Sequence, residues 1–333
     1  MSRPEVTVVV SPRERFSGTR LALESLFAAT ATPFRLVYVD GGAPGSVRRY
    51  LRSRARARGF DLLGGASYLS PIRARNLAFA RVDTEYVVFL DNDVVVAPGW
   101  FDALLGCARS TGAWIVAPLY CIDRPFHTKV HMAGGVAHVE QGEGARRLVE
   151  GHLHMHRPLD EVRREVVRSP CEQAEFHCLL ARTDAMRRLG PLDERFLAAP
   201  EVQIDLCLRA RAMGGGVWSE PSALVTYDRP ASLRLYDVPY FLLRWSEDWG
   251  RRGLEHFRRA WDLAADDPYF AMQLTFMAWH RSIALRPLLR LLRPLPKARR
   301  KRVSEWVAAR VARLVETTRI DPRPSFPAVP ATS

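Results

Sequence analysis

The pattern of apolar and polar positions in the first 120 residues alternates between strand-like and helix-like segments. Predominantly apolar runs predict strands buried on both faces of a sheet, at 6–10, 34–39 and 86–90, and the first of them is β-branched throughout. Apolar residues at helical spacing predict helices between them, at 19–29, 47–58 and 71–81. This alternation predicts an α/β fold with a doubly wound parallel sheet, in which ligands bind beyond the carboxyl ends of the strands.

The chain beyond residue 120 is less regular. Residues 120–170 are predicted to be loop-rich and carry six histidines. A strand is predicted at 174–181, helices at 183–189 and 205–213, and a short strand at 217–218 before a turn at Pro221. Arginine-rich and aromatic helices are predicted from 239 to 318, and four prolines within 321–333 predict a flexible tail.

Composition changes this picture little, because 47% hydrophobic and 26% charged residues over 333 positions are ordinary for a folded protein. The sequence holds no run of 18 uncharged apolar residues, so no membrane-spanning helix is predicted. No secretory segment is recognised near the N-terminus, and the five cysteines form no C-x-x-C pair. We therefore expect a cytoplasmic protein in a reducing environment.

Positive charge is concentrated near the C-terminus. Of the net charge of +13, residues 281–320 supply +10, with 12 Lys and Arg against two acids. No nucleic-acid-binding motif accompanies them, so we expect no nucleic acid partner. An apolar helix at 270–292, containing Trp279 and followed by the basic run 296–302, is typical of peripheral attachment to an anionic membrane surface, here the inner leaflet. The alternative is a helix packed on the rest of the chain or in a homodimer.

Two carboxylates, Asp91 and Asp93, directly follow the predicted strand 86–90. Their charges are costly beside an apolar strand unless a cation compensates them, and Mg²⁺ or Mn²⁺ prefers carboxylate and phosphate oxygens. An ordinary pair of loop or helix-capping aspartates is the alternative. The position at a strand end favours a metal site that also binds a diphosphate.

Two further strand-end positions suit a nucleotide. Asp40 follows the strand 34–39 and precedes two glycines, so its carboxylate can accept a hydrogen bond from a ribose hydroxyl or a base, although a turn aspartate has the same pattern. Arg73 and Arg75 open the helix that starts at Pro71, where guanidinium groups and the helix dipole both favour a diphosphate. A solvated basic helix face is the alternative.

These motifs occur in an order that resembles family 2 glycosyltransferases of the GT-A fold. The resemblance rests on VTVVVSPRER, LVYVDGG and RARNLAFARVDTEYVVFLDNDVVVAPGW, and later on LLARTDAMRRLGPLDERF and IDLCLRARAMGGGVWSEPSALV. It covers residues 5–228, about two thirds of the chain. It implies a Rossmann-type mixed sheet with a helical C-terminal extension, a nucleotide-sugar donor, a Mn²⁺ or Mg²⁺ ion, and inversion at the transferred sugar. UDP is the favoured nucleotide because it is frequent in the family.

The resemblance also implies a division of the chain and roles for single residues. Residues 1–120 would form the donor-binding half, 121–235 the acceptor-binding half and 236–320 a helical extension. The metal contacts would be Asp91 and Asp93. The donor contacts would lie in the loop after the first strand and at the later strand ends, namely at Pro12, Arg13, Glu14, Asp40, Arg75, Asn76, Asp91 and Asn92.

Two positions depart from the family pattern. Gln203 stands where the family has its catalytic aspartate, and a glutamine cannot accept a proton at neutral pH. Glu201, two residues earlier, is the favoured replacement, and Asp205 matches the second acid of the motif, where a structural role at a helix start is favoured. Tyr227 replaces the family's histidine metal ligand, so either Tyr227 or the adjacent Asp228 is expected to complete the metal site.

Glu175 is the second candidate for the catalytic base. Glu175 and His177 would alternate onto one face of the predicted strand 174–181, where they could contact an acceptor or simply form a polar face. The histidines between 127 and 156 lack zinc-site spacing apart from H-x-H-x-H at 152–156, and are expected in a loop that could act as a lid.

The sequence thus predicts a metal-dependent, inverting glycosyltransferase. Its acceptor would be a hydroxyl group of a cell-envelope or natural-product glycan, a small molecule or a lipid-linked sugar. A nucleotidyltransferase would need a lysine in the loop after the first strand, and residues 11–18 contain none. A catalytically silent glycosyltransferase-like binding or scaffold protein is the remaining alternative, favoured by Gln203 and Tyr227.

Overall fold

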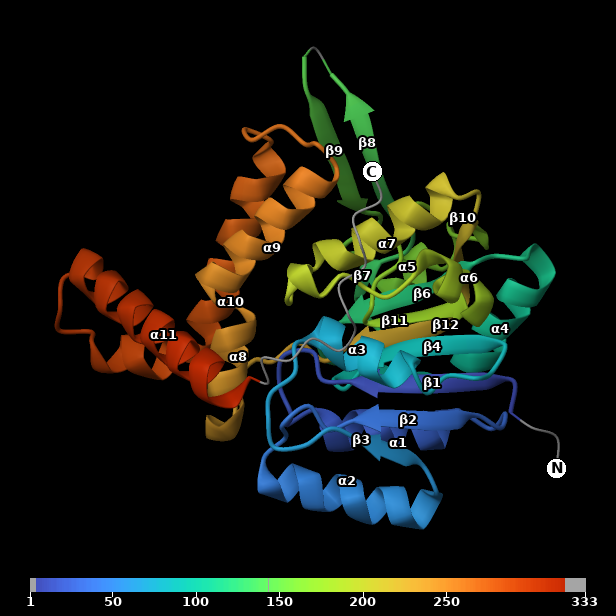
Figure 1. Ribbon diagram of the computed structural model, residues 1–333, viewed down its shortest axis with the longest axis horizontal. Coiled ribbons are helices and arrows are strands. Elements are labelled where there is room, and N and C mark those ends of the chain that lie inside the picture. The colour runs from blue at the N-terminus through green and yellow to red at the C-terminus, as the bar shows by residue number, and fades with distance from the viewer. Residues whose placement is uncertain (1–3, 143, 321–333) are drawn as a thin grey trace.

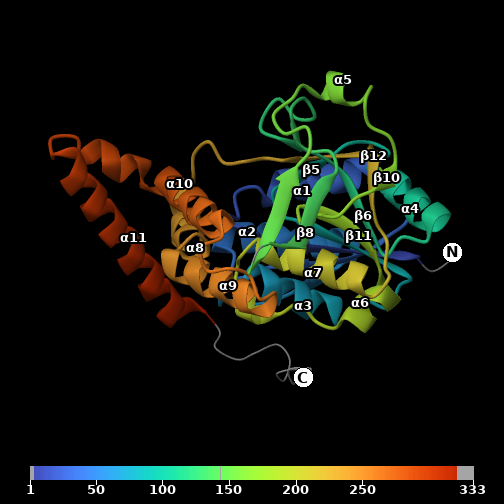
Figure 2. The ribbon, with the colours of Figure 1, turned by 90° about the horizontal axis from the view of Figure 1, so that it is seen from above.

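A ten-stranded mixed sheet is the centre of the computed structural model, which describes residues 4–142 and 144–320 (Figures 1 and 2). The strand order is β10-β12-β6-β11-β4-β1-β2-β3, with β5 paired to β12 and β7 paired to β6. The strands are β1 (Val6–Ser11), β2 (Arg35–Val39), β3 (Asp61–Leu63), β4 (Tyr86–Asp91), β5 (Val94–Val96), β6 (Ile115–Ile122), β7 (Val130–Met132), β10 (Ser169–Pro170), β11 (Cys178–Arg182) and β12 (Val217–Tyr227). The predicted flexible tail, 321–333, lies outside the described residues.

The first half of the sheet is parallel, as its apolar runs predict. β4, β1, β2 and β3 pair in parallel, and every residue of β1 and β4 is buried, which explains why these strands are mostly apolar up to their polar last residue. The predicted elements of this half are confirmed to within two residues. The connecting helices are α1 (Thr19–Ala29), α2 (Gly45–Arg58) and α3 (Pro71–Phe79).

Antiparallel strands make the second half mixed. β11 runs antiparallel to both β4 and β6, whereas β12 runs parallel to β6. β6 crosses residue 120, and strands from both predicted halves belong to one sheet. The sheet therefore shows no boundary at residue 120, and the division into 1–120, 121–235 and 236–320 stays a prediction. The helices of this half are α4 (Trp100–Thr111), α5 (Leu159–Val162), α6 (Thr183–Leu189) and α7 (Glu201–Ala212), with a 3₁₀ turn η1 (Glu194–Phe196).

The prediction for the second half is wrong in four places. The loop-rich prediction for residues 120–170 contains no strands, but these residues include β7 and a hairpin of β8 (Gly135–Gln141) and β9 (Arg146–His152). β11 begins at Cys178 instead of 174, and α7 begins four residues earlier than predicted. β12 continues past Pro221, which has no N–H to donate and lies where the pairing register with β6 shifts.

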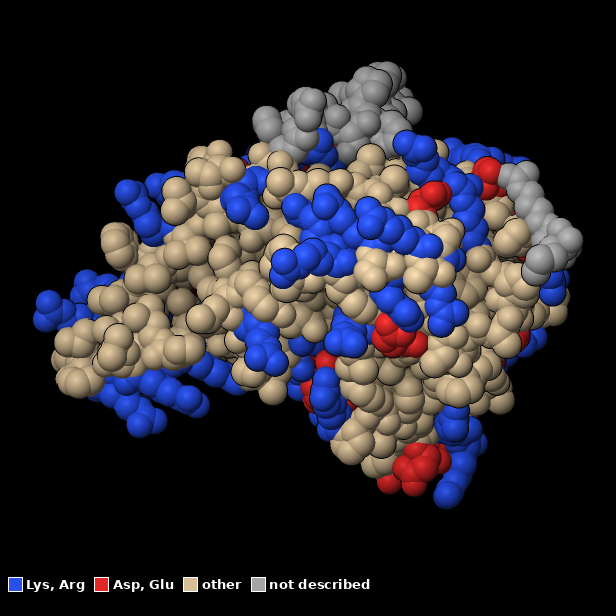
Figure 3. All heavy atoms as spheres, turned by 90° about the horizontal axis from the view of Figure 1, so that it is seen from below, with Lys and Arg blue, Asp and Glu red and all other residues tan. Residues whose placement is uncertain are grey.

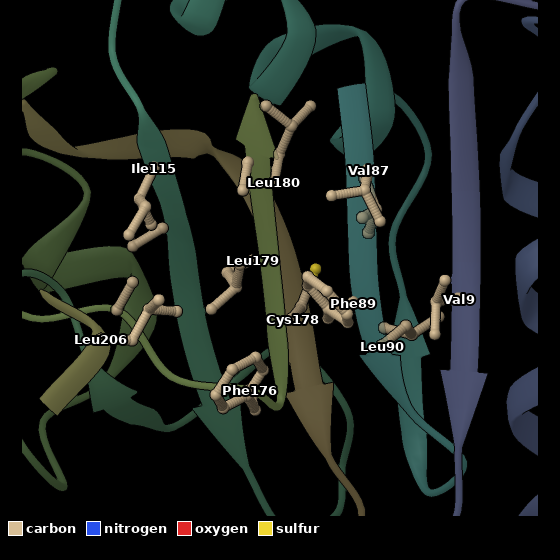
Figure 4. Close-up of a cluster of buried hydrophobic side chains, with 14 of the residues drawn as sticks. Val9, Val87, Phe89, Leu90, Ile115, Phe176, Cys178, Leu179, Leu180 and Leu206 are labelled. Carbon is tan, nitrogen blue, oxygen red and sulfur yellow. The ribbon is translucent and has the colours of Figure 1, made fainter. Parts of the chain in front are cut away.

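Buried side chains between the sheet and its helices form one large hydrophobic core. Figure 4 shows part of it, where Phe89 of β4 and Phe176 meet edge to face with ring centroids 5.5 Å apart. Leu206 of α7 and Leu179 of β11 belong to the same cluster. Close packing of this kind holds the strand ends in fixed positions, and the polar residues that follow them are therefore fixed as well.

Four helices after β12 stand at one end of the sheet, the end toward which β1, β2 and β4 point (Figure 1). Trp245, just after α8, stacks on His280 of α10 with ring centroids 3.8 Å apart. α11 packs on α8, where Ala308 and Leu242 belong to one buried cluster. The helices are α8 (Val238–Arg244), α9 (Glu247–Ala260), α10 (Pro268–Leu291) and α11 (Lys297–Arg319), and a 3₁₀ turn η2 (Leu235–Asp237) precedes them.

Basic side chains gather on the face shown in Figure 3, over α2 and the projecting C-terminal helices. The same helices expose large apolar side chains, among them Phe276 and Trp279 of α10 and Trp306 of α11. Within the described part of the chain, no helix is both long enough and apolar enough to cross a bilayer.

Candidate functional site

The polar residues that follow β1, β2 and β4 meet at one edge of the sheet. Ser11 and Asp91 are direct neighbours at the paired ends of β1 and β4. Pro12 lies against Gly41, where an added Cβ would be 2.3 Å from the proline ring, so the loops after β1 and β2 are in contact. Asp40, beside Gly41, accepts hydrogen bonds from the Ala43 amide at 2.6 Å and from Arg48 Nε at 2.6 Å.

Asp91 is buried among positively charged and polar groups. Arg75 Nη2 donates to Asp91 Oδ1 at 2.6 Å, and Arg13 Nε and His177 Nδ1 lie 3.5 and 3.4 Å from Oδ2. Burial alone would raise the pKa of Asp91, but Arg75, His177 and Arg13 together outweigh it and the pKa is lowered. Asp91 therefore carries a negative charge at neutral pH.

Asp93 lies in a different environment, although it is only two residues away. Its side chain is buried, and neither carboxylate oxygen accepts a hydrogen bond from the residues the structure describes. The nearest cation is Arg15, with Nε 3.7 Å from Oδ2. Burial raises the pKa of Asp93 to about 8. A buried carboxylate with two unused oxygens fits a divalent cation, which would hold it in the charged form.

Asn92 and Asn76 use their side-chain amides to hold backbone. Asn92 Nδ2 donates to the Arg15 carbonyl at 2.8 Å, and its Oδ1 accepts from the Arg13 amide at 3.2 Å. Asn76 pairs with the backbone N–H and C=O of Leu192 at 3.0 and 2.8 Å. Both asparagines therefore position loops of the site. Their side chains are engaged with backbone, so this geometry by itself does not provide a contact from either asparagine to a nucleotide sugar.

Glu14 connects the first loop to the C-terminal helices. Its carboxylate is fully buried and accepts hydrogen bonds from Tyr227 Oη at 2.6 Å and Trp245 Nε1 at 2.9 Å, with Arg13 Nη1 also at 2.9 Å. Burial would raise the pKa of Glu14, but Arg13 and neighbouring groups lower it to about 2. Since the Tyr227 hydroxyl is bound to Glu14, it does not offer a free metal ligand. Asp228 pairs with Arg15 and with Arg124, so its carboxylate is also engaged.

A narrow cavity of about 50 Å³ lies between these strand ends, α7 and the C-terminal helices. Three arginines, Arg13, Arg75 and Arg244, face it together with the acids Asp91 and Glu175. Such a site has the charge to bind an anionic group. Its other lining residues are Pro71, Ile72, Phe176, His177, Ala198, Ala199, Pro200, Val202 and Gln203.

Glu175 is the carboxylate that lines this cavity from the α7 side. Gln203 Nε2 donates to Glu175 Oε1 at 3.1 Å, so the amide that departs from the family pattern holds a carboxylate in place. His131 Nε2 lies 3.1 Å from Oε2. Although burial acts to raise it, the pKa of Glu175 is well below its usual value because of His131 and the other histidines. Glu175 lies in the turn before β11 and does not alternate along a strand with His177 as predicted.

Glu201 and Asp205 lie on α7, but neither lines the cavity. Glu201 is fully buried and accepts a hydrogen bond from Tyr269 Oη at 2.8 Å, and burial raises its pKa to about 7. Asp205 accepts from Arg209 Nε at 2.8 Å and from Trp261 Nε1 at 3.1 Å. The preference for Glu201 as base therefore has no support from the geometry, because the earlier start of α7 directs this side chain into the core.

Sequence reasoning missed the contribution of the C-terminal helices to the site. Arg244 of α8 lines the cavity, and burial lowers its pKa to about 10. Trp245 and His280 cover Glu14 from the same side. The local sequence gives no sign of these contacts, which depend on how α8 and α10 pack against the end of the sheet.

Comparison with known proteins agrees with this arrangement. Residues 7–168 match the family model "Glycosyl transferase family 2". A pre-mycofactocin glycosyltransferase of Mycobacterium tuberculosis is 28% identical over 236 residues, which is 70% of this chain and 44% of the relative. The chain thus spans less than half the length of this curated relative.

Two solved structures share the fold. GalNAc-T7, in a crystal structure with UDP, GalNAc and Mn²⁺, superposes with a TM-score of 0.52 at 13% identity, over 82% of this chain and 56% of that one. The mannosyltransferase PcManGT of Pyrobaculum calidifontis, in complex with GDP-Man and Mn²⁺, gives 0.50 at 15% identity, over 95% and 88%. The fold is therefore of the GT-A type with additional C-terminal helices. Residues 7–168 thus match glycosyl transferase family 2, and the chain shares its fold with solved GT-A glycosyltransferases.

Proposed function

We propose that the chain transfers a sugar from a nucleotide-sugar donor to a hydroxyl group of an acceptor, with inversion at the sugar. The observation that carries this proposal is a cavity lined by three arginines and Asp91, with Asp93 two residues further along the same strand end. The two buried oxygens of Asp93 accept no hydrogen bond from the described residues. A divalent cation and a diphosphate are complementary to that combination of charges.

On the donor side, Asp93 and Asp91 would hold the Mn²⁺ or Mg²⁺ ion and Arg75 would bind the diphosphate. The ion would supply positive charge to the departing nucleoside diphosphate. Arg13 and Arg244 add further positive charge to the lining of the cavity. Pro12 and Asp40 remain the proposed nucleoside contacts at the neighbouring strand ends. Because roughly 300 Å³ or more is usual for a ligand pocket, binding must move lining side chains out of the cavity of about 50 Å³.

On the acceptor side, Glu175 is the proposed general base. It faces the cavity, and Gln203 fixes one of its oxygens. As the acceptor oxygen attacks the anomeric carbon, its proton would pass to Glu175 while the bond to the diphosphate breaks on the opposite face. Glu201 and Asp205 would then stabilise α7 without touching either substrate.

The nucleotide and the sugar stay open within this proposal. The two related structures carry UDP in one case and GDP-mannose in the other. UDP-sugars are the first candidates because UDP is frequent in the family, and GDP-sugars are the second.

We further propose that the C-terminal helices bring the site to an anionic membrane surface, at the cytoplasmic inner leaflet, where a lipid-linked acceptor would be available. Trp279 and Phe276 are 42% and 43% exposed, and α11 begins with a basic run from Lys297. Each basic residue close to an anionic surface contributes about 1 kcal/mol. A homodimer through the same exposed side chains is the competing explanation.

Release of nucleoside diphosphate, measured with Mn²⁺ and with or without acceptor, tests the function. Glu175→Gln should lower transfer by roughly 10²- to 10⁴-fold while donor binding stays normal. Glu201→Gln is the matched control and should retain turnover. A catalytically silent binding protein, the alternative that Gln203 suggests, would bind donor in all three proteins and release nothing in any of them.

A further inference from the structure

Two histidines from separate strands converge on Glu175, on the side away from the strand-end carboxylates. His131 lies in the middle of β7, and His152 is the last residue of β9. One ligand atom from each of these three side chains lies within 4.8 Å of the other two. This trio has no local spacing that would predict it, because its members are 21 and 23 positions apart and the fold alone brings them together.

The distances between these atoms suit three ligands of one ion. His131 Nε2 is 3.1 Å from Glu175 Oε2, and His152 Nε2 is 3.6 Å from Glu175 Oε1. Ligands around a tetrahedral ion with bonds of about 2.0–2.1 Å are about 3.3 Å apart. Glu175 Oε2 is buried, and its contact with His131 Nε2 does not meet the geometry of an ordinary hydrogen bond.

The three side chains are held in place and can still be reached. Gln203 donates to Glu175 Oε1, and the Glu175 amide donates to Tyr120 Oη at 2.9 Å. These contacts resemble the outer hydrogen bonds that orient ligands in metal sites. The side chains of His131 and His152 are 15% and 13% exposed, so an ion can enter from solvent. Glu150 Oε1, 3.1 Å from His152 Nε2, offers a further carboxylate at the edge.

We propose that His131, His152 and Glu175 form a binding site for a divalent transition-metal ion of the Zn²⁺ class, separate from the one proposed at Asp91 and Asp93. Two imidazoles and one carboxylate, with a fourth position open, are a ligand set that Zn²⁺ takes in proteins. Imidazole nitrogen favours Zn²⁺ over Mn²⁺ or Mg²⁺, whereas the oxygen ligands at Asp93 favour Mn²⁺ or Mg²⁺. The two sites are therefore expected to select different ions.

The two sites are close enough to influence each other. His177 lies between them, with Nδ1 3.4 Å from Asp91 Oδ2 and Nε2 3.9 Å from Glu175 Oε2. An ion bound to Glu175 would occupy the carboxylate that the proposed function uses as its base. On that basis, and resting on the proposed function, Zn²⁺ should inhibit transfer supported by Mn²⁺.

Binding of Zn²⁺ to the full chain by titration calorimetry, with Mn²⁺ in excess, tests the site directly. We expect one tight Zn²⁺ ion per chain, and with Co²⁺ in its place a visible absorption spectrum of a tetrahedral site. His131→Gln and His152→Gln should each weaken this binding by more than about 100-fold, because a ligand is removed instead of an outer contact. His156→Gln, which changes an exposed histidine of the same segment, is the matched control and should bind as the wild type.

The variant Asp93→Asn distinguishes the proposed Zn²⁺ site from the strand-end carboxylates. It should still bind one Zn²⁺ ion tightly, because Asp93 is not one of the three proposed ligands. Melting curves of each variant identify any that fails to fold. If one of the two histidine variants does not fold, the test relies on the other. Absence of tight Zn²⁺ binding to the wild type, or its loss in Asp93→Asn but not in the histidine variants, would overturn the proposal. Tight binding without inhibition of transfer would support the metal site and overturn Glu175 as the base.

Discussion

The replacement Glu201→Gln distinguishes a buried structural acid from a catalytic one. Glu201 is fully buried at the start of α7, and its Oε1 accepts a hydrogen bond from Tyr269 Oη. A glutamine keeps that acceptor and nearly the same volume, but it cannot ionise. The variant therefore removes the burial of a charge and leaves the packing almost unchanged.

The magnitude follows from the pKa of Glu201, which burial raises from 4.5 to about 7. Below pH 4.5 the group is protonated in both the folded and the unfolded chain, so it does not affect stability. As the pH rises from 4.5 to 7, the unfolded chain releases this proton first, and the folded protein loses stability. At 1.36 kcal/mol per pKa unit, this loss amounts to about 2–3 kcal/mol between pH 5 and pH 8.

Urea unfolding at pH 5 and pH 8, followed by tryptophan fluorescence, measures this difference. We compare the free energy of unfolding of Glu201→Gln with that of the wild type at each pH. This difference should shift in favour of the variant by about 2–3 kcal/mol between pH 5 and pH 8. The exposed Glu247, also near the start of a helix, provides a control, since Glu247→Gln should leave the pH dependence as it is in the wild type. Equal pH dependence in Glu201→Gln and the wild type would refute the burial argument. A loss of turnover of about 100-fold would refute the structural role of Glu201.

Two other perturbations test the site and the helices. Gly18→Ala would place a Cβ 2.9 Å from the Asp93 Cβ, so we expect Mn²⁺-dependent donor binding to weaken by about 10-fold and stability to fall by about 1–3 kcal/mol. Gly45→Ala is the control, because an added Cβ there meets open space and should change neither quantity. Equal donor affinity in the two variants would count against the position of Asp93. The wild type should float with anionic but not neutral vesicles at low salt, and reversal of charge at the exposed Lys297, Arg299 and Arg302 should abolish flotation without lowering the melting temperature. Flotation that survives this reversal, or concentration-dependent dimerisation in place of flotation, would overturn membrane attachment.

A chain ending at Asp267 would be a poor test of membrane attachment. Such a chain lacks His280, which stacks on Trp245, and Trp245 donates to Glu14 in the site. It also lacks Arg281, which donates to the Trp245 carbonyl at 3.0 Å. Loss of donor binding on truncation would therefore report damage to the site, which is why charge reversal on α11 is the better perturbation.

The parallel half of the fold could be predicted from the sequence because its signals are local. β1 and β4 are buried at every position, so each is a continuous apolar run that ends where the polar site begins. The strand-end residues Asp40, Asp91 and Asp93 could be located for the same reason. The environments of these side chains could not be predicted. Asp91 has Arg75 as its charged neighbour and Asp93 has Arg15, and both arginines come from other elements of the fold.

The acceptor side could not be predicted, since long-range packing decides it. A shift of four residues in the start of α7 places Glu201 in the core and Gln203 beside Glu175. The histidines of residues 120–170 resemble a loop in sequence, but β7 and β9 deliver two of them to Glu175. Neither the start of α7 nor the convergence of these histidines on Glu175 can be predicted from the local pattern of apolar and polar residues.

Binding of nucleotide sugars in the presence and absence of Mn²⁺, followed as a shift in melting temperature, tests the central claim most directly. One class of nucleotide sugar should stabilise the wild type only when Mn²⁺ is present, by about 2.7 kcal/mol at a concentration of 100 times the Kd. Asp93→Asn should fold and lose this stabilisation. The account is contradicted if no nucleotide sugar stabilises the wild type with Mn²⁺, or if Asp93→Asn is stabilised to the same extent.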